Sequence, residues 1–183
     1  MSQNNDHPFL HSTRIDISPE IRAYLISMLN QTLACTVDLR SHVKQASWNV
    51  KGHDFSQLHA LFATMASELD AYTDLVAERI AVLGGMARGT ARTAATQSTL
   101  PEYPDAIVEG QAHVWALAER FGPYARAIRD DIAHAADVED ADSAAIYTDI
   151  SRGVDKRLWF LEAHLFRCGA SAAPTDCPGE EEA

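Results

Sequence analysis

Three side chains of one predicted helix have the types and spacing of metal ligands. Asp74 and Glu78 lie four residues apart, so a helix places both carboxylates on one face, where they could chelate a hard cation. His59 precedes Asp74 by 15 residues and offers an imidazole nitrogen. At about 1.5 Å per residue this separation is roughly 20 Å of helix, so a single copy of the helix cannot bring His59 to the two acids.

A second copy of the chain would remove this obstacle. If two such helices pack antiparallel across a two-fold axis, His59 of one subunit can meet Asp74 and Glu78 of the other, and symmetry gives two equivalent sites per dimer. The spacing also fits a simpler alternative, in which Glu78 and Arg79 belong to a charged, solvated helix face. Spacing alone leaves both interpretations open.

Other pairs of acids and histidines fit a metal site less well. The sequence contains no Glu-x-x-His motif, which helical bundles use to bind two metal ions at their centre. The nearest pattern is Asp131-x-x-His134, which we expect to be solvated surface. Glu109 and His113 are four residues apart and are expected to make a contact on a helix face. A metal site at the bundle centre is therefore not predicted.

Two long helices are expected to carry the first candidates. Ser18-Pro19-Glu20 combines an N-cap, a proline at the first helical position and an acid in the first turn. Apolar residues then recur at three- and four-residue steps, which predicts a helix from 19 to about 50, with Ser47 on or near its buried stripe. Ser56 is the expected cap of a second helix that runs to 83, where Gly84-Gly85 ends it.

Two further helices complete the predicted fold. Pro104-Asp105 is expected to open the third, which reaches about 136 with a kink or break at Gly122-Pro123, and the fourth covers about 142–168. The long crossover at 86–103 is expected to include a short helix around 90–97. No segment shows the alternation of a strand. The chain is therefore predicted to be all-α, a four-helix bundle of the ferritin-like kind with a short helix in the crossover.

The composition predicts one globular domain between two polar segments. We expect the bundle at 18–168, a flexible N-terminal tail at 1–17 and a flexible acidic C-terminal tail at 169–183. Three cysteines without zinc-finger spacing fit a reducing cytoplasm. No uncharged apolar stretch of about 18 residues occurs, so no membrane span is predicted. The net charge of -11 disfavours binding to DNA or anionic membranes and favours a cation as the partner.

Four runs of residues resemble one known family in order and spacing. They are KQASWNVKGHDFSQLHALF at 44–62, DLVAERIAVLGG at 74–85, YP at 103–104 and DKRLWFLE at 155–162. Over about residues 20–165 the chain is similar to the Dps miniferritins, the DNA-protection-during-starvation proteins. The resemblance implies a hollow shell of twelve subunits that oxidises Fe(II), preferentially with hydrogen peroxide, and stores the ferric mineral inside. It also implies a ferroxidase site at the two-fold interface, the arrangement that the helix spacing required.

Carried over position by position, the resemblance retains three of five metal ligands. His59, Asp74 and Glu78 match ligands of the family and would hold and oxidise iron. The family has a histidine where this chain has Ser47, and an aspartate where it has Ala63. The remaining nitrogen and oxygen donors suit Fe(II), and equally Zn(II) or Mn(II). We therefore expect an atypical centre with weaker binding or a single occupied metal position, and slow or altered oxidation.

The resemblance also assigns roles around this site and at the pores of the shell. Trp48 neighbours the site in the family, and it is expected either to trap oxidising equivalents or to be a core or interface residue. Ser47 is expected to hydrogen-bond a bound water. Asp149 and Asp155 fall in the region that lines three-fold pores, where negative potential draws cations inward, although either also fits solvated helix surface.

The predicted function is that of a cytoplasmic miniferritin that protects against oxidative stress. It would oxidise and store iron in a dodecamer and protect DNA chemically, without binding it at neutral pH. Residues 1–17 contain a single arginine, Arg14, against Asp6 and Asp16, so they would not attract phosphate. The alternative is a catalytically impaired cage or metal-binding assembly, for zinc, manganese or iron, that has lost part of the ferroxidase centre.

Overall fold

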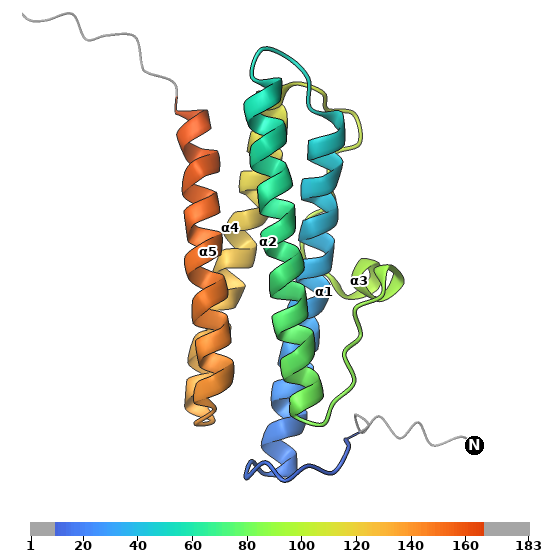
Figure 1. Cartoon of the computed structure of the whole chain (residues 1–183), viewed down its shortest axis with the longest axis vertical. Coiled ribbons are helices and arrows are strands. Elements are labelled where there is room, and N and C mark those ends of the chain that lie inside the picture. Colours follow the sequence, from blue (N-terminus) through green and yellow to red (C-terminus); the bar gives the residue numbers. More distant parts are fainter. Residues whose placement is uncertain (1–9, 167–183) are drawn as a thin grey trace, which may run out of the picture.

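The computed structural model describes residues 10–166, which form two helical hairpins and a short crossover helix (Figure 1). The first hairpin is α1 (Pro19–Asn49) with α2 (Phe55–Val82), and the second is α4 (Gly110–Asp137) with α5 (Ala141–Leu165). Helix α3 (Ala91–Gln97) lies in the crossover and packs against α1. The predicted all-α four-helix bundle with a short crossover helix is confirmed. Across residues 10–166 the only strand-like pairing is an isolated bridge between Lys51 and Glu109.

The first hairpin follows the sequence signals closely. Helix α1 begins as expected, with the Ser18 hydroxyl accepting a hydrogen bond from the amide of Ile21. Helix α2 begins one residue before the expected cap, so Ser56 lies inside it and Asp54 is the N-cap residue. The reason is the turn before it, because Gly52 adopts φ 112° and its carbonyl accepts from the amide of Phe55. At the other end of α2, Gly84 has φ 87° and terminates the helix.

The third long helix differs from its prediction at two places. Helix α4 begins at Gly110 and not at 104–105, because the preceding residues run alongside the first loop, where the amide of Lys51 donates to the Val108 carbonyl at 3.0 Å. Of the kink or break expected at Gly122-Pro123, the break does not occur, since α4 continues through Pro123. Pro123 is on the exposed side of the helix, while the core side remains packed, so water can meet the carbonyl that proline leaves unpaired.

The segment before α1 contacts the end of the first hairpin. The amide of His11 donates to the Gly84 carbonyl at 2.7 Å. The buried Arg22 guanidinium donates to the carbonyls of Ile17, His11 and Leu83. These bonds place residues 10–17, the described part of the predicted N-terminal tail, against the bundle. The rest of that tail, and the C-terminal tail at 169–183, lie outside the described residues.

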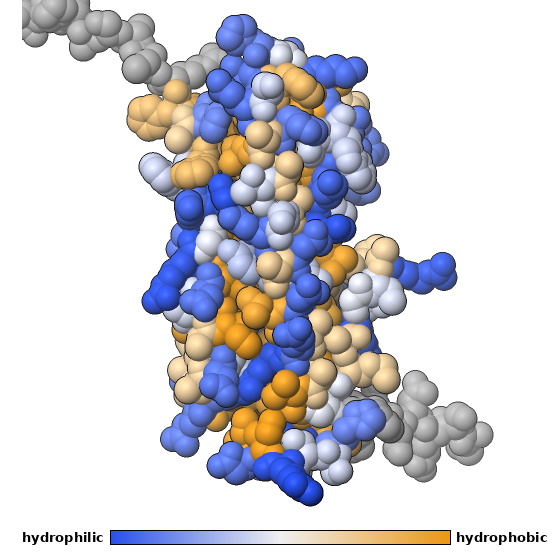
Figure 2. All heavy atoms as spheres, in the orientation of Figure 1, coloured by the Kyte–Doolittle hydropathy of each residue, from blue (hydrophilic) through white to orange (hydrophobic). Residues whose placement is uncertain are grey.

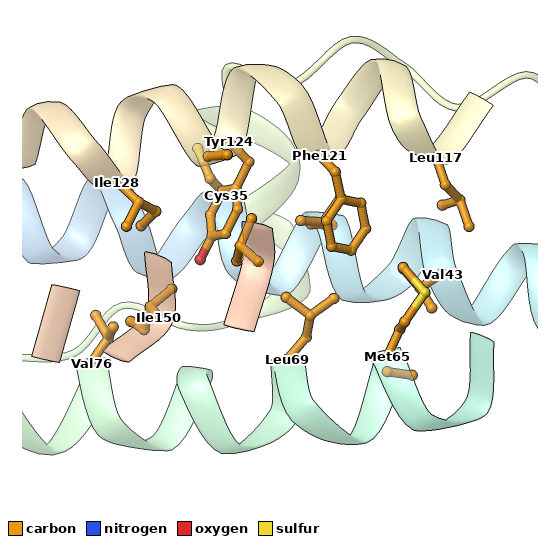
Figure 3. Close-up of a cluster of buried hydrophobic side chains, with 14 of the residues drawn as sticks. Cys35, Val43, Met65, Leu69, Val76, Leu117, Phe121, Tyr124, Ile128 and Ile150 are labelled. Carbon is orange, nitrogen blue, oxygen red and sulfur yellow. The ribbon is translucent and has the colours of Figure 1, made fainter. Parts of the chain in front are cut away.

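The core runs along the axis of the bundle and is largely apolar. Side chains of α4 and α2 face one another across it (Figure 3), and those that the figure labels on the two helices are Leu117, Phe121, Tyr124, Ile128, Met65, Leu69 and Val76. The hydroxyls of two buried tyrosines form hydrogen bonds with threonine hydroxyls of α1. Tyr124 bonds to Thr36 at 2.7 Å, and Tyr147 bonds to Thr32 at 3.2 Å. The bundle centre therefore holds hydroxyl pairs, consistent with the missing Glu-x-x-His motifs. Within residues 10–166, no helix combines the length and apolar character needed to cross a membrane.

Two glycines inside helices have opposite surroundings, and this predicts opposite effects of alanine. A methyl group at Gly153 would overlap the Tyr72 hydroxyl and lie 2.9 Å from its Cζ, whereas a methyl group at Gly122 would meet nothing within 4 Å. We expect Gly153→Ala to destabilise the fold by about 1–3 kcal/mol through overpacking. Gly122→Ala should stabilise it by up to about 1 kcal/mol, because alanine favours the helix. Chemical denaturation of both variants measures these changes.

The double variant Gly153→Ala/Tyr72→Phe tests whether the clash with Tyr72 causes the loss of stability. Removing the phenolic oxygen removes the closest clash, so part of the lost stability should return. Equal stability of Gly153→Ala and the unmodified protein would show that Tyr72 moves aside freely.

Candidate metal centre

The three predicted ligands lie on the outward face of α2. The buried face of this helix is an apolar stripe that includes Val76 and Ile80. Asp74 and Glu78 each precede one of these residues by two positions, which turns them by about 200° to the opposite side. His59, in the second turn of α2, is also exposed. Burial of the stripe thus directs all three side chains to the surface.

His59 is oriented so that one ring nitrogen is free for a metal. Its Nδ1 lies 2.9 Å from the backbone carbonyl of Ser47 and 3.4 Å from the Ser47 hydroxyl. Since a carbonyl only accepts, Nδ1 carries the hydrogen and Nε2 keeps its lone pair. The Phe55 ring stacks on the imidazole at 5.5 Å. A metal-binding histidine commonly has its other nitrogen fixed in this way.

The two carboxylates have no competing partner among residues 10–166. Neither Asp74 nor Glu78 forms an ion pair or hydrogen bond there. The alternative placed Arg79 with Glu78 on a charged, solvated face, and for Arg79 it is wrong, because this guanidinium turns inward and is buried. Asp74 and Glu78 are exposed, as both interpretations require. Two like charges four residues apart repel each other, and a cation between them would remove that repulsion.

A single chain does not assemble the predicted site. Within residues 10–166, no group of three or more His, Cys, Asp or Glu side chains is placed to hold a metal ion. His59 and the acid pair lie near opposite ends of α2, as the spacing requires. Two donors of the family pattern are missing, because Ser47 is buried against His59 and Ala63 offers an exposed methyl group. Any site built from these ligands needs a second copy of the chain.

The neighbourhood of the ligands is apolar and exposed. Trp48 is 68% exposed, with the Lys44 ammonium 5.5 Å from its ring centre. It is therefore not a core residue of the single chain, and its place at an interface stays a prediction. Phe55, Leu75 and Val82 also remain about half exposed. On the face shown in Figure 2, apolar side chains lie among hydrophilic ones over α2 and its neighbours. Such a surface suits contact with another protein chain.

The buried Arg79 side chain connects the C-terminal end of α2, which carries Asp74 and Glu78, to the second hairpin. Its Nη2 donates to Asp140 at 2.6 Å and its Nε donates to the Ser143 hydroxyl at 3.0 Å. Asp140 is also the N-cap residue of α5. Burial acts to raise the pKa of Asp140, but the hydrogen bonds from Arg79 and Ser143 outweigh it and lower the pKa. Sequence reasoning missed this buried pair, whose signal was an aspartate at a helix start.

The acids assigned to a pore are paired on the surface of the single chain. Asp155 accepts from Arg129 at 2.7 Å, and Asp149 accepts from Arg152 at 3.3 Å. All four side chains are at least half exposed. The role of Asp149 and Asp155 in lining a pore stays a prediction that depends on the assembly.

Two residues of the other acid and histidine pairs, Asp131 and His113, are more buried than expected. Asp131, expected to be solvated, is largely buried and accepts a hydrogen bond from Thr32 at 2.9 Å, and burial raises its pKa. His113, expected to contact the Glu109 side chain on a helix face, is 1% exposed and bonds to Tyr103. Both are drawn inward because they lie on the core-facing side of α4.

Comparison with known proteins places the chain in a family. Residues 26–169 match the family model of the ferritin-like domain. A DNA protection during starvation protein of Agrobacterium fabrum is 39% identical over 155 residues, which are 85% of this chain and 96% of that protein. The chain thus belongs to the ferritin-like proteins and, within them, to the Dps family.

Solved structures agree with this assignment. DpsC from Streptomyces coelicolor superposes with a TM-score of 0.85 at 26% identity, over 93% of this chain and 99% of that one. Dps from Microbacterium arborescens, solved in a high iron form, has a TM-score of 0.75 at 29% identity, over 81% of this chain and 96% of that one.

The buried pair predicts a contrast between two neighbouring aspartates. Asp140→Ala removes the buried counter-ion of the Arg79 cation and the N-cap of α5, so we expect a loss of about 3–5 kcal/mol. Asp142 is 83% exposed and lies 3.6 Å from the same guanidinium. Asp142→Ala should therefore cost less than about 1 kcal/mol. Urea denaturation compares the two, and similar losses for both variants would contradict the burial argument.

Proposed function

We propose that this Dps protein is a miniferritin that binds and oxidises Fe(II), with hydrogen peroxide as the oxidant, and stores the ferric product inside a hollow cage. The observation that carries the proposal is a set of three exposed metal-ligating groups on α2. They are His59, whose Nε2 is free, and the carboxylates of Asp74 and Glu78. These donor types suit Fe(II), which is here the substrate and the cargo.

The site is proposed to form between two chains. Two α2 helices that pack antiparallel across a two-fold axis bring His59 of one to Asp74 and Glu78 of the other. The half-exposed apolar residues of the same helix, Phe55, Leu75 and Val82, supply area that such a contact would bury. The full shell is proposed to be a dodecamer with its metal sites at these two-fold interfaces.

The substitutions at Ser47 and Ala63 predict an atypical centre. Three protein donors leave open positions that water must fill, so iron should bind more weakly, with a single metal position occupied. Reduction of one peroxide takes two electrons, whereas one Fe(II) supplies one. A centre with one iron must therefore react twice for each peroxide, which makes oxidation slow. The Ser47 carbonyl positions His59, and Trp48 lies exposed nearby, where oxidising equivalents could be trapped.

Protection is proposed to be chemical, in the cytoplasm and without coating of DNA. The net charge of -11 opposes contact with phosphate at neutral pH. Asp149 and Asp155 are proposed to line pores and draw cations inward, which requires their exposed arginine partners to move in the assembly.

The second candidate function is a catalytically impaired cage that holds zinc, manganese or iron. The exposed methyl group of Ala63, where the family places a carboxylate, favours it. Anaerobic binding titrations and metal analysis separate the two functions. Metal that binds without oxidation of Fe(II) would support the cage, and oxidation linked to the three ligands supports the miniferritin.

Removal of the ligands predicts a loss of oxidation without a loss of assembly. Asp74→Ala/Glu78→Ala should reduce the iron-plus-peroxide rate to that of solution without protein, because the acid pair supplies the negative charge that holds Fe(II). His59→Asn keeps an amide that can donate to the Ser47 carbonyl but lacks Nε2. We expect at least about tenfold weaker metal binding. Stopped-flow absorbance and titration with Fe(II) measure both effects.

Asp70→Ala is the matched control for these variants. Asp70 is exposed on α2 one turn before Asp74, but it pairs with Arg40 and is outside the ligand set. Its oxidation rate should stay within about twofold of the unmodified protein, since a surface pair contributes little. An unchanged rate in the double acid variant would refute the site.

A further inference from the structure

Tyr103 fastens the crossover between the two hairpins. The crossover runs from Ser98 to Glu109, after α3 and before α4. Tyr103 is 7% exposed, and it is the residue of this segment that enters the bundle most deeply. Its ring lies 5.3 Å from the ring of His42 on α1, and its hydroxyl lies 2.7 Å from Nδ1 of His113 on α4. One side chain thus joins the crossover to both hairpins.

The hydrogen bond between Tyr103 and His113 joins a phenol to a buried imidazole. Burial raises the pKa of the Tyr103 phenol, so this group keeps a proton that it can donate to the imidazole. When the phenol donates, Nδ1 of His113 accepts, and the imidazole is neutral with its hydrogen on Nε2. That Nε2 is buried and has no partner among residues 10–166. A protonated imidazole would therefore have one N–H without an acceptor, at Nε2, and its Nδ1–H could bond to Tyr103 only if the hydroxyl turned its own hydrogen away.

The charges around this pair also oppose a proton on His113. The Arg120 guanidinium is buried, lies 5.4 Å from the Tyr103 ring centre, and donates to the carbonyls of Ala116 and Glu102. It forms no ion pair within the described part of the chain. The side chains of Glu102 and Glu109 are exposed, so neither carboxylate is buried against His113. Burial lowers the pKa of His113.

His42, the other buried histidine, differs in one respect. Its Nε2 lies 3.4 Å from the Asp38 carboxylate, one turn earlier on α1. Burial lowers the pKa of His42, and the Arg120 charge adds to this, but Asp38 acts in the opposite direction. A proton on His42 thus has a counter-ion, and a proton on His113 has none.

We propose that Tyr103, His113 and Arg120 form an acid-released latch that holds the crossover segment 98–109 on the bundle. Protonation turns Nδ1 of His113 from an acceptor into a donor, so the Tyr103 hydroxyl loses its acceptor, and a second buried cation forms beside Arg120. The closed latch excludes the proton and the open one takes it up. The latch is therefore fully stable above about pH 6.5 and weakens as the pH falls below that value.

Opening of the latch should affect the segments that are attached to residues 98–109. The bond between the Lys51 amide and the Val108 carbonyl and the first turn of α4 are attached to the same segment. The apolar core that joins α1 to α2 extends over many residues besides Tyr103, among them Leu33, Leu69 and Ile80. Acid should therefore open the crossover and the start of α4 while the first hairpin stays closed.

Hydrogen exchange of the assembled full-length protein, read by mass spectrometry at pH 7.5 and 5.5, tests the latch. Each measured exchange rate is divided by the intrinsic rate at the same pH. On this scale, peptides that cover Lys51 and 98–116 should exchange about tenfold faster at pH 5.5 than at pH 7.5. Tenfold is the factor expected one pH unit below an ordinary histidine pKa. Peptides from the middle of α2 should not change. No local increase in the unmodified protein would overturn the proposal.

Three variants identify the sensor. His113→Asn keeps an acceptor near the position of Nδ1 that cannot be protonated, so the acid increase should disappear, and its persistence would refute the latch. His42→Asn should retain the increase, and its loss there would move the sensor to His42 and also refute the latch. If His113→Asn fails to assemble, the Tyr103→Phe variant tests the proposal in its place. Without the hydroxyl, exchange should already be fast at pH 7.5, and full protection at that pH would contradict the proposal.

Discussion

Burial of one face of α2 is the constraint on which the rest of this structure depends. The stripe that includes Leu69, Val76 and Ile80 must face the core, and the geometry of a helix then forces Asp74 and Glu78 outward together. Arg79 reinforces this rotation, since its guanidinium is buried on the core side and bonded to the start of α5. The acid pair is thus held on the surface by interactions that lie beneath it.

The same constraint places the candidate metal ligands on the outside of the bundle and not at its centre. The centre is filled by apolar side chains and by hydroxyl pairs such as Tyr124 with Thr36, which satisfy each other without a cation. The outward face carries donors that lack partners and apolar groups that lack cover. A second copy of the chain would meet both needs at once, because it brings the missing imidazole and buries the apolar surface. Assembly and chemistry are then one requirement in this fold.

The sequence was sufficient for the fold because its signals are local. Helix α1 begins at the cap formed by Ser18, and α2 ends at the Gly84 turn, where each signal concerns a few adjacent residues. The start of α4 was mispredicted because Pro104 resembles a helix start, while Tyr103 and the contact at Lys51 keep the chain from becoming helical before Gly110. Long-range contacts of this kind leave no periodic pattern.

The candidate site was predictable in part for the same reason. The pair Asp74 and Glu78 follows from a four-residue spacing, and the separation from His59 follows from helical rise. The free Nε2 of His59 could not be foreseen, because it depends on the carbonyl of Ser47 across a loop. The buried position of His113 was also missed, since a spacing of four from Glu109 carries no information on burial.

Mixed assembly of two variants that each lack part of the ligand set tests the shared site most directly. His59→Asn subunits keep both acids, and Asp74→Ala/Glu78→Ala subunits keep the imidazole. Unfolded together in equal amounts and refolded, they form dimers of which half pair unlike chains, and each such dimer has one complete site, so about a quarter of the normal iron oxidation should return. No recovery in properly assembled mixed shells would contradict a site built from two chains.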